Sequence, residues 1–255
     1  MAKPFDGKTA IVTGASRGIG EAIARRLAAD GARVVVCARS EADLKKVASE
    51  IGGAAIALDL RLPEAGNQLA QFAVEKFGSI DVVVNNAGAT KRGEFLTLTD
   101  EDFADGFALK YFGAVRLTRA AWPHLKSSQG SVVFISGVGG RSPGAQFTIG
   151  GSVNAALLSF TKAVAEVGIA DGVQVNCVNP GTIRTGRYTH RLEAMAKQKG
   201  IDPAHAEAEY VKNAESTRIG EPWEIGAFVS FIAGPEGRYL HGAILDIDGG
   251  STKTL

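Results

Sequence analysis

A glycine-rich segment near the start of the chain has residue types and spacing that could bind phosphate. Residues 13–20 read TGASRGIG, between the apolar run KTAIV and the helical pattern EAIARRLA. Gly14 allows a tight turn, and Gly18 and Gly20 let the backbone approach a pyrophosphate and a neighbouring strand. The N–H groups at the start of the following helix would then meet the phosphates. We predict a dinucleotide site here; the alternative is a glycine-rich turn that holds no ligand.

Residues at the end of the second apolar run indicate which dinucleotide would fit. An acidic residue at this place would accept hydrogen bonds from the adenine-ribose hydroxyls of NAD. The sequence instead reads VVVCARSE, with Arg39 near the expected acid and Arg17 in the glycine-rich loop. Two guanidinium groups suit a 2′-phosphate. They predict NADP(H), and the alternative for each arginine alone is a solvated side chain.

Short apolar runs alternate with longer helical patterns along the chain. Strands are expected at 9–13, 33–38, 54–58, 81–85, 131–136, 173–178 and 243–248. Amphipathic segments such as 20–30 and 67–78 lie between them. Strands that are apolar at nearly every position are usually covered on both faces. The pattern predicts an α/β fold, a single-domain Rossmann-like doubly wound parallel sheet of about seven strands with helices on both faces.

No linker, repeat or low-complexity block divides the sequence, so one domain is expected over residues 1–255. The irregular stretch is 186–217, which is polar and helix-prone and delays the last strand. We expect it to form a helical insertion on the substrate side, over the carboxyl edge of the sheet. Ligands bind at that edge in this architecture.

Composition and charge argue against several classes of function. The 255 residues carry a net charge of +1, which favours neither nucleic acid nor an anionic membrane. We find no apolar run near about 18 residues and no signal-peptide pattern in MAKPFDGK, so we expect no membrane span and a cytoplasmic protein. Cys37 and Cys177 lie in apolar runs without metal-ligand spacing. Buried thiols and no metal site are therefore expected.

Further motifs, in order and spacing, resemble the short-chain dehydrogenase/reductase family over essentially the whole chain. They are TGASRGIG at 13–20, LDL at 58–60, NNAG at 85–88, NPGTIRT at 179–185 and DIDGG at 246–250. The resemblance implies hydride transfer between a carbonyl and an alcohol by a nicotinamide cofactor, in a homo-oligomer (tetramer or dimer). It places cofactor contacts at Gly14, Ser16, Gly18, Ile19, Gly20, Asp59, Leu60, Asn86, Ala87, Gly88, Pro180, Gly181, Ile183 and Thr185.

The chain departs from this family at the catalytic positions. The family uses a Tyr as proton donor, a Lys four residues later, a Ser thirteen residues before the Tyr, and an Asn on the preceding long helix. Counting back from the TK that ends LLSFTK puts the Lys position at Asn154 and the Tyr position at Gly150. The Ser position is then Gly137, and the Asn position is Lys110. The usual tyrosine-based proton transfer is therefore absent.

Lys110 could replace the missing proton donor. Its side chain would point into the space left by the two glycines and by the shorter Asn154. Burial there would lower the pKa of the amine towards neutrality, which suits proton donation to a ketone oxygen. Asn154 could hydrogen-bond the same oxygen or orient the lysine. The alternative is that Lys110 fills space or pairs with an interior carboxylate.

Other residues near these positions predict the shape and charge of the pocket. Ser136 should face away and hydrogen-bond backbone. An open pocket, occupied by a bulky ligand or closed by other backbone, is predicted from Gly137, Gly139, Gly140, Gly150 and Gly151. Arg184, Arg187 and Arg191 would suit an anionic group on a small-molecule substrate if they face the cleft. Otherwise they are solvated charges on a helix.

Three functions remain open from the sequence. The first is an NADP(H)-dependent oxidoreductase of divergent short-chain type, acting on a carbonyl/alcohol pair with Lys110 as proton donor. The second is a non-catalytic NADP-binding pseudoenzyme that serves as a sensor or a partner subunit. The third is a lyase or isomerase that uses the bound cofactor as a scaffold. The cofactor motifs favour ligand binding in the first two and do not separate them.

Overall fold

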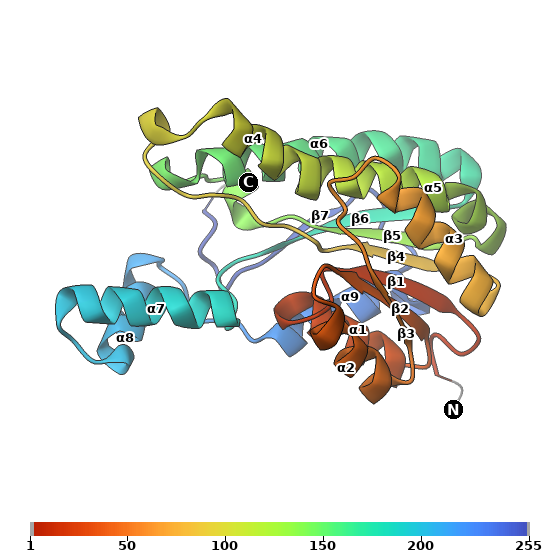
Figure 1. The fold of residues 1–255 in the computed structure, drawn as a ribbon, viewed down its shortest axis with the longest axis horizontal. Helices are drawn as coiled ribbons and strands as arrows, with labels where there is room; N and C mark the ends of the chain where they lie inside the picture. The colour runs from red at the N-terminus through yellow and green to blue at the C-terminus, as the bar shows by residue number, and fades with distance from the viewer. Residues whose placement is uncertain (1–2, 254–255) are drawn as a thin grey trace.

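The computed structural model describes residues 3–253 and builds them around a seven-stranded sheet in which every strand pair is parallel (Figure 1). The strands are β1 (Thr9–Thr13), β2 (Arg33–Ala38), β3 (Ala54–Ala57), β4 (Val82–Asn85), β5 (Ser131–Ile135), β6 (Gln174–Pro180) and β7 (Ile244–Ile247). Their order across the sheet is β3-β2-β1-β4-β5-β6-β7, which reverses direction between β1 and β4. Each strand lies within two residues of its predicted position, and the predicted fold class is confirmed.

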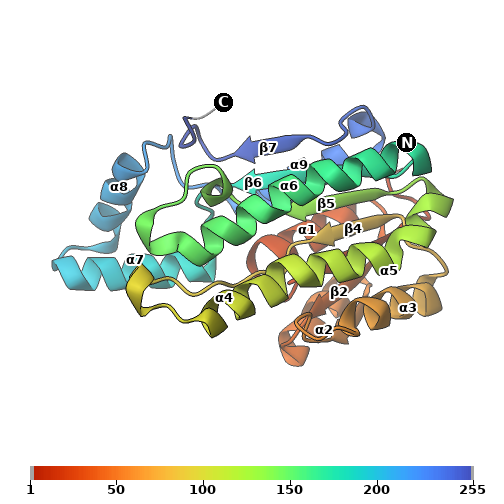
Figure 2. The same cartoon turned by 90° about the horizontal axis from the view of Figure 1, so that it is seen from above.

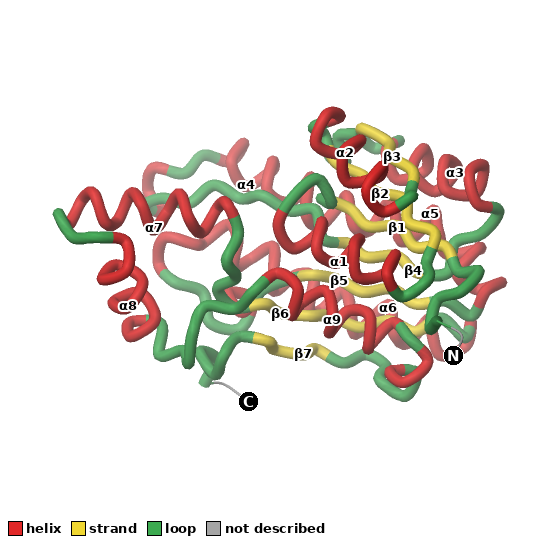
Figure 3. The backbone as a smooth tube through the Cα atoms, turned by 90° about the horizontal axis from the view of Figure 1, so that it is seen from below, coloured by secondary structure: helices red, strands yellow, loops and turns green. Residues whose placement is uncertain are grey.

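Helices cover both faces of the sheet (Figures 2 and 3). One layer contains α1 (Gly18–Ala29), α2 (Glu41–Ile51) and α9 (Pro222–Ala233), and the other contains α3 (Ala65–Phe77), α5 (Gly113–Ser128) and α6 (Thr148–Asp171). Val34 and Val36 of β2 pack in the core on the first side, and Val35 packs in the core on the second. Successive side chains of a strand point to opposite faces, so a sheet covered on both sides needs continuous apolar runs.

The longest helix, α6, lies within a segment, Ala145–Asp171, that is long and apolar enough to cross a membrane by length and composition alone. No membrane span was expected from the sequence, because no apolar run in it approaches about 18 residues. In the fold, α6 contacts β6, and its residues Val153, Leu157 and Ala165 are buried. It therefore packs as a core helix does.

Two helices fill most of the stretch 186–217, where a helical insertion was expected. They are α7 (Gly186–Lys199) and α8 (Pro203–Asn213), and both extend beyond the carboxyl ends of the strands (Figure 1). They share a small apolar cluster that includes Tyr188, Leu192 and Ala206. Short 3₁₀ turns lie at Phe95–Thr97, Val138–Gly140, Ala145–Phe147 and Pro235–Gly237.

The helix that precedes β5 is irregular. It begins as α4 (Asp100–Gly106), where Thr99 and Asp102 form a reciprocal capping box. A π-helical turn over Phe107–Phe112 then joins α4 to α5. Such turns inside α-helices occur frequently at functional sites. Lys110 lies within this turn.

Candidate active site

The glycine-rich loop leaves the carboxyl end of β1, beside the point where the strand order reverses. In parallel sheets ligands bind at this point. Gly14 and Gly18 have φ angles of 65° and 63°, a region that favours glycine. A Cβ atom on Gly20 would lie 2.4 Å from the carbonyl oxygen of Gly14, so only glycine lets α1 pack this closely. No side chain caps the first turn of α1, which leaves its N–H groups available to a phosphate.

The asparagines of the NNAG segment hold this edge of the sheet together. Nδ2 of Asn86 donates to the carbonyl oxygen of Thr13 at 2.9 Å, and Oγ1 of Thr13 accepts from the backbone N–H groups of Asn86 and Ala87. Nδ2 of Asn85 donates to Oγ1 of Thr118 at 3.0 Å. Both amide side chains are therefore engaged in the scaffold, and the segment would meet a cofactor mainly through backbone at Ala87 and Gly88.

The residues expected to hold the adenosine end of the cofactor lie after β2 and β3. Oδ1 of Asp59 accepts from the backbone N–H of Arg61 at 3.1 Å, which orients the carboxylate. Leu60 is buried. Arg17 and Arg39 are exposed, and neither forms a salt bridge within residues 3–253. Two guanidinium groups without salt bridges to carboxylates therefore lie on the loops that are expected to flank the adenine ribose of the cofactor.

The loop after β6 returns to the glycine-rich loop. It leaves the strand through buried Pro180, and a Cβ atom on Gly181 would lie 2.7 Å from the Cβ atom of Asp248. Ile183 forms a β-bridge with Gly220. A Cβ atom on Gly18 would lie 3.2 Å from the methyl group of Thr185, so the two loops touch. The predicted cofactor residues, which are distant in sequence, therefore line one edge of the sheet.

Lys110 and Asn154 meet across two helices. Nζ of Lys110 donates to Oδ1 of Asn154 at 2.6 Å and to the carbonyl oxygen of Ser136 at 2.8 Å. The aliphatic part of Lys110 passes over Gly88, where a Cβ atom would lie 2.8 Å from Cδ of the lysine. No carboxylate pairs with the amine among residues 3–253. An interior ion pair, one of the structural alternatives for Lys110, is therefore not found there.

The environment of Lys110 makes its amine easier to deprotonate than an ordinary lysine. The pKa of the amine is lowered from 10.5 to about 8, mainly by burial; Cys177 opposes this lowering, and the positive charge of Arg187 makes the smallest contribution to it. The lowering by desolvation agrees with the expectation from the sequence. An amine with this pKa changes protonation state close to neutral pH, as a general acid or base must.

Gly137 lies beside Asn154 and tolerates no side chain. Its φ angle is 154°, and a Cβ atom would lie 3.0 Å from Nδ2 of Asn154. Its N–H donates to Oδ1 of Asn179 at 3.3 Å. The hydroxyl of Ser136 donates to the carbonyl oxygen of Asn154 at 3.1 Å, so the expected backbone bond of this serine is confirmed. A serine at position 137 would therefore strain the backbone and crowd Asn154.

The space around these glycines is not open, because Phe147 fills it beside Gly139 and Gly150, and other parts of the chain approach the remaining glycines. A Cβ atom on Gly150 would lie 2.0 Å from the Phe147 ring, and one on Gly139 would lie 2.8 Å from it. The guanidinium of Arg92 stacks over the same ring at 4.0 Å from its centroid. Neither Phe147 nor Arg92 was singled out from the sequence. The runs of glycine were the one available signal, since they indicate that some bulky group approaches.

The three arginines that open the insertion have different partners. Arg184 forms salt bridges with Glu207 and Glu221, so it is not free to hold a substrate anion, and this alternative does not hold for Arg184. Nη2 of Arg187 donates to the carbonyl oxygen of Gly88 at 3.2 Å. Arg191 donates to the hydroxyl of Tyr210 at 2.6 Å.

No tyrosine replaces the missing proton donor. Tyr111 packs edge-on against Phe107, Phe112 and Phe160. Tyr188 donates to Glu207, and Tyr210 contacts Thr182 and Arg191. Tyr239 is fully exposed. Among the described residues, none of these hydroxyls has a hydrogen bond to Lys110 or Asn154, so the amine remains the titratable group of the site.

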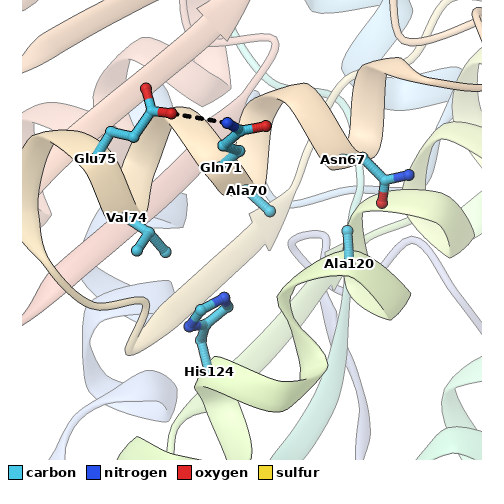
Figure 4. Close-up of a pocket in the computed structure, with 7 residues that line it drawn as sticks. All are labelled: Asn67, Ala70, Gln71, Val74, Glu75, Ala120 and His124. Atoms are coloured by element: carbon cyan, nitrogen blue, oxygen red, sulfur yellow. Dashed lines mark hydrogen bonds between the residues drawn. The ribbon is translucent and has the colours of Figure 1, made fainter.

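Two surface hollows lie apart from the Lys110–Asn154 pair. One is between α3 and α5, lined by Asn67, Ala70, Gln71, Val74, Glu75, Ala120 and His124 (Figure 4). The other is between α7, α8 and the start of α9, and includes Arg184, Glu207 and Trp223.

Comparisons with known proteins find relatives that match nearly the whole chain. A family model described as enoyl-(acyl carrier protein) reductase matches residues 14–252. An uncharacterized oxidoreductase of Mycobacterium tuberculosis is 37% identical over 255 residues, covering 97% of this chain and 93% of its own. L-sorbose reductase from Gluconobacter frateurii, solved with NADPH and L-sorbose, has a TM-score of 0.94 and 30% identity, with 100% of both chains covered.

A further solved structure is similar in fold and has an unusual catalytic centre. It is a short-chain oxidoreductase from Pseudomonas aeruginosa PAO1, in apo form, described as containing an atypical catalytic center. Its TM-score is 0.91 at 27% identity, covering 98% of this chain and 99% of that one. The family model, the relatives and the fold agree over nearly the whole sequence. The chain therefore belongs to the short-chain dehydrogenase/reductase family.

Proposed function

We propose that the protein is an NADP(H)-dependent oxidoreductase that interconverts a carbonyl and an alcohol, with Lys110 as the proton donor instead of the usual tyrosine. The observation that carries the proposal is the position of the Lys110 amine, bonded to Asn154 and to the Ser136 carbonyl oxygen. A buried amine with a pKa lowered to about 8, bonded to the residue at the family's lysine position, supports this proposal.

The cofactor would lie along the carboxyl edge of the sheet. The pyrophosphate fits the glycine-rich loop and the uncapped start of α1, and Arg17 and Arg39 would hold the 2′-phosphate. L-sorbose reductase, a relative in fold, was solved with NADPH, which supports this choice. When bound, the cofactor supplies the hydride, and the protein must supply orientation and a proton.

The contacts of Lys110 leave one N–H group of its ammonium available to a substrate. An ammonium group has three N–H donors and no acceptor. Two of the donors are used by Oδ1 of Asn154 and the carbonyl oxygen of Ser136. The third can donate to a carbonyl oxygen and so stabilise the negative charge that develops there during reduction. In the reverse direction the neutral amine keeps the same two bonds and turns its lone pair towards the alcohol.

The experiment compares cofactor binding with turnover in Lys110→Met. We expect the wild type to reduce members of a carbonyl panel with NADPH, and we expect kcat of the variant to be about 10²–10⁴-fold lower. The affinity of the variant for NADPH, measured by fluorescence titration, should equal that of the wild type. Lys162→Met, which removes an exposed amine from α6, is the matched control. Full turnover in Lys110→Met would disprove the role of the lysine. Tight cofactor binding without turnover of any carbonyl would favour the pseudoenzyme.

The family resemblance also leads us to propose a homo-oligomer, either a tetramer or a dimer. Large apolar side chains are exposed on two helices, with Ile169 of α6 66% exposed and Trp223 of α9 67% exposed. Such groups gain free energy when a second subunit covers them. Light scattering on the purified protein would test the proposal, and a monomer at micromolar concentration would contradict it.

A further inference from the structure

Three arginines approach one another at the mouth of the site. Arg187 and Arg191 are four residues apart and so lie on one face of α7. Arg92 follows β4, on the segment that includes Gly88, and stacks on Phe147. The hydrogen bond from Arg187 to the carbonyl oxygen of Gly88 joins α7 to the segment that carries Arg92. In agreement with this contact, burial and the charges of Arg191 and Arg187 lower the pKa of Arg92.

The contacts of these arginines orient the side chains without neutralising them. Arg92 lies over an aromatic ring, Arg187 donates to the carbonyl oxygen of Gly88, and Arg191 donates to a tyrosine hydroxyl. None of the three has a salt bridge to a carboxylate in the part of the chain that the structure describes. Glu94, two residues after Arg92, accepts a hydrogen bond from Gln146 instead.

Other arginines nearby are neutralised. Arg184, three residues before Arg187, pairs with two glutamates, and Arg218 pairs with Glu224. Three like charges held together without a counterion repel one another. An anion bound between them would remove that repulsion and form charge-assisted hydrogen bonds.

The arginine cluster (Arg92, Arg187 and Arg191) is close to the reacting position. Arg187 bonds the carbonyl oxygen of Gly88, and Lys110 passes directly over Gly88. Arg92 rests on the ring of Phe147, which fills the place of the usual tyrosine at Gly150. A small molecule whose carbonyl oxygen meets Lys110 could therefore extend a second group into the cluster.

We propose that the substrate is an oxo compound that carries an anionic group, a carboxylate or a phosphate ester, held by Arg92, Arg187 and Arg191. The proposal rests on the oxidoreductase function proposed above for its carbonyl. It assigns to these side chains a specificity role that is separate from the 2′-phosphate contacts of Arg17 and Arg39.

Matched pairs of probes test the anion site in the NADP⁺-loaded protein. Levulinate is compared with methyl levulinate, and dihydroxyacetone phosphate with dihydroxyacetone, by titration calorimetry. We expect the charged member of at least one pair to bind about 10–100-fold more tightly, since each charged hydrogen bond contributes about 1.5–3 kcal/mol. Preference for the carboxylate pair or for the phosphate pair tells which anion the site accepts.

Arg92→Met and Arg191→Met should each reduce that preference about tenfold while the affinity for NADPH stays the same. Arg238→Met is the matched control, because Arg238 donates to the carbonyl oxygen of Gly130, which precedes β5 at the amino ends of the strands. Equal binding within both pairs, no binding of any probe, or a preference unchanged in both variants would overturn the inference.

Turnover separates this inference from the proposed function. Tight binding of a charged probe without reduction by NADPH of any carbonyl would support the anion site and contradict the oxidoreductase. Reduction of neutral and charged probes with equal efficiency would support the oxidoreductase and contradict the anion site.

Discussion

Nζ of Lys110 and Oδ1 of Asn154 lie 2.6 Å apart and join the π-helical turn before α5 to α6. The family resemblance places an amide on the first helix and an amine on the second, and this chain has them exchanged. The distance is that of a charge-assisted hydrogen bond. The exchanged pair therefore keeps an amine within the site while changing the helix from which it comes.

The protonation of Lys110 should determine the pH dependence of carbonyl reduction. With a pKa of about 8, the amine is charged and able to donate below that pH, so kcat/KM should be level there and fall above it. Asn154→Asp would put a carboxylate beside the amine, favour the charged form and move the fall to higher pH. Asn67→Asp, on the surface of α3, is the control. An unchanged profile in Asn154→Asp would show that another group limits the rate.

The same pKa should make stability depend on pH. A lysine in an unfolded chain has a pKa near 10.4, so between about pH 8 and 10.4 the unfolded state binds more protons than the folded state. The free energy of unfolding should therefore rise with pH in this window, by up to about 3 kcal/mol relative to Lys110→Met. Urea unfolding at about pH 7 and about pH 10 measures the difference. Lys162→Met should show no such change, and a pH-independent difference for Lys110→Met would contradict the burial of the amine.

Phe147 and Gly150 should be energetically coupled. A Cβ atom on Gly150 would lie 2.0 Å from the ring, so Gly150→Ala should cost about 1–3 kcal/mol of unfolding free energy despite the better helix propensity of alanine. Adding Phe147→Leu should recover part of that cost, giving a coupling energy above about 0.5 kcal/mol. Gly186→Ala, where a Cβ atom meets nothing within 4 Å at the first residue of α7, should be close to neutral. Additive effects of the two substitutions would show that the ring moves aside freely.

Arg17 and Arg39 should set the choice of cofactor. Arg39→Met should weaken NADPH binding about 10–100-fold, since it removes charged hydrogen bonds to the 2′-phosphate, and should leave NADH binding almost unchanged. Arg33→Met is a suitable control because Arg33 begins the same strand and donates to the carbonyl oxygen of Gly7. Fluorescence titration with both cofactors gives the ratio of their dissociation constants. A wild type that binds NADH more tightly than NADPH would contradict the assignment.

The fold was predictable because its signals are local. Each strand of a sheet covered on both faces must be apolar at almost every position, and the helices between strands keep a regular apolar period. The seven strands therefore lie within two residues of their predicted positions. The family resemblance also singled out Lys110 and Asn154, because their positions follow from the spacing of its motifs along the π-helical turn and α6.

The shape and charge of the pocket were decided by the tertiary structure. Gly150 indicates that something approaches it, but only the fold shows that Phe147 does so and that Arg92 stacks on that ring. Arg184, Arg187 and Arg191 look alike in sequence, yet α8 brings Glu207 to Arg184 alone. Strands and helices follow from residues that are close together in the sequence, so they could be predicted. Contacts between side chains depend on which distant segments meet in space, so they required the tertiary structure.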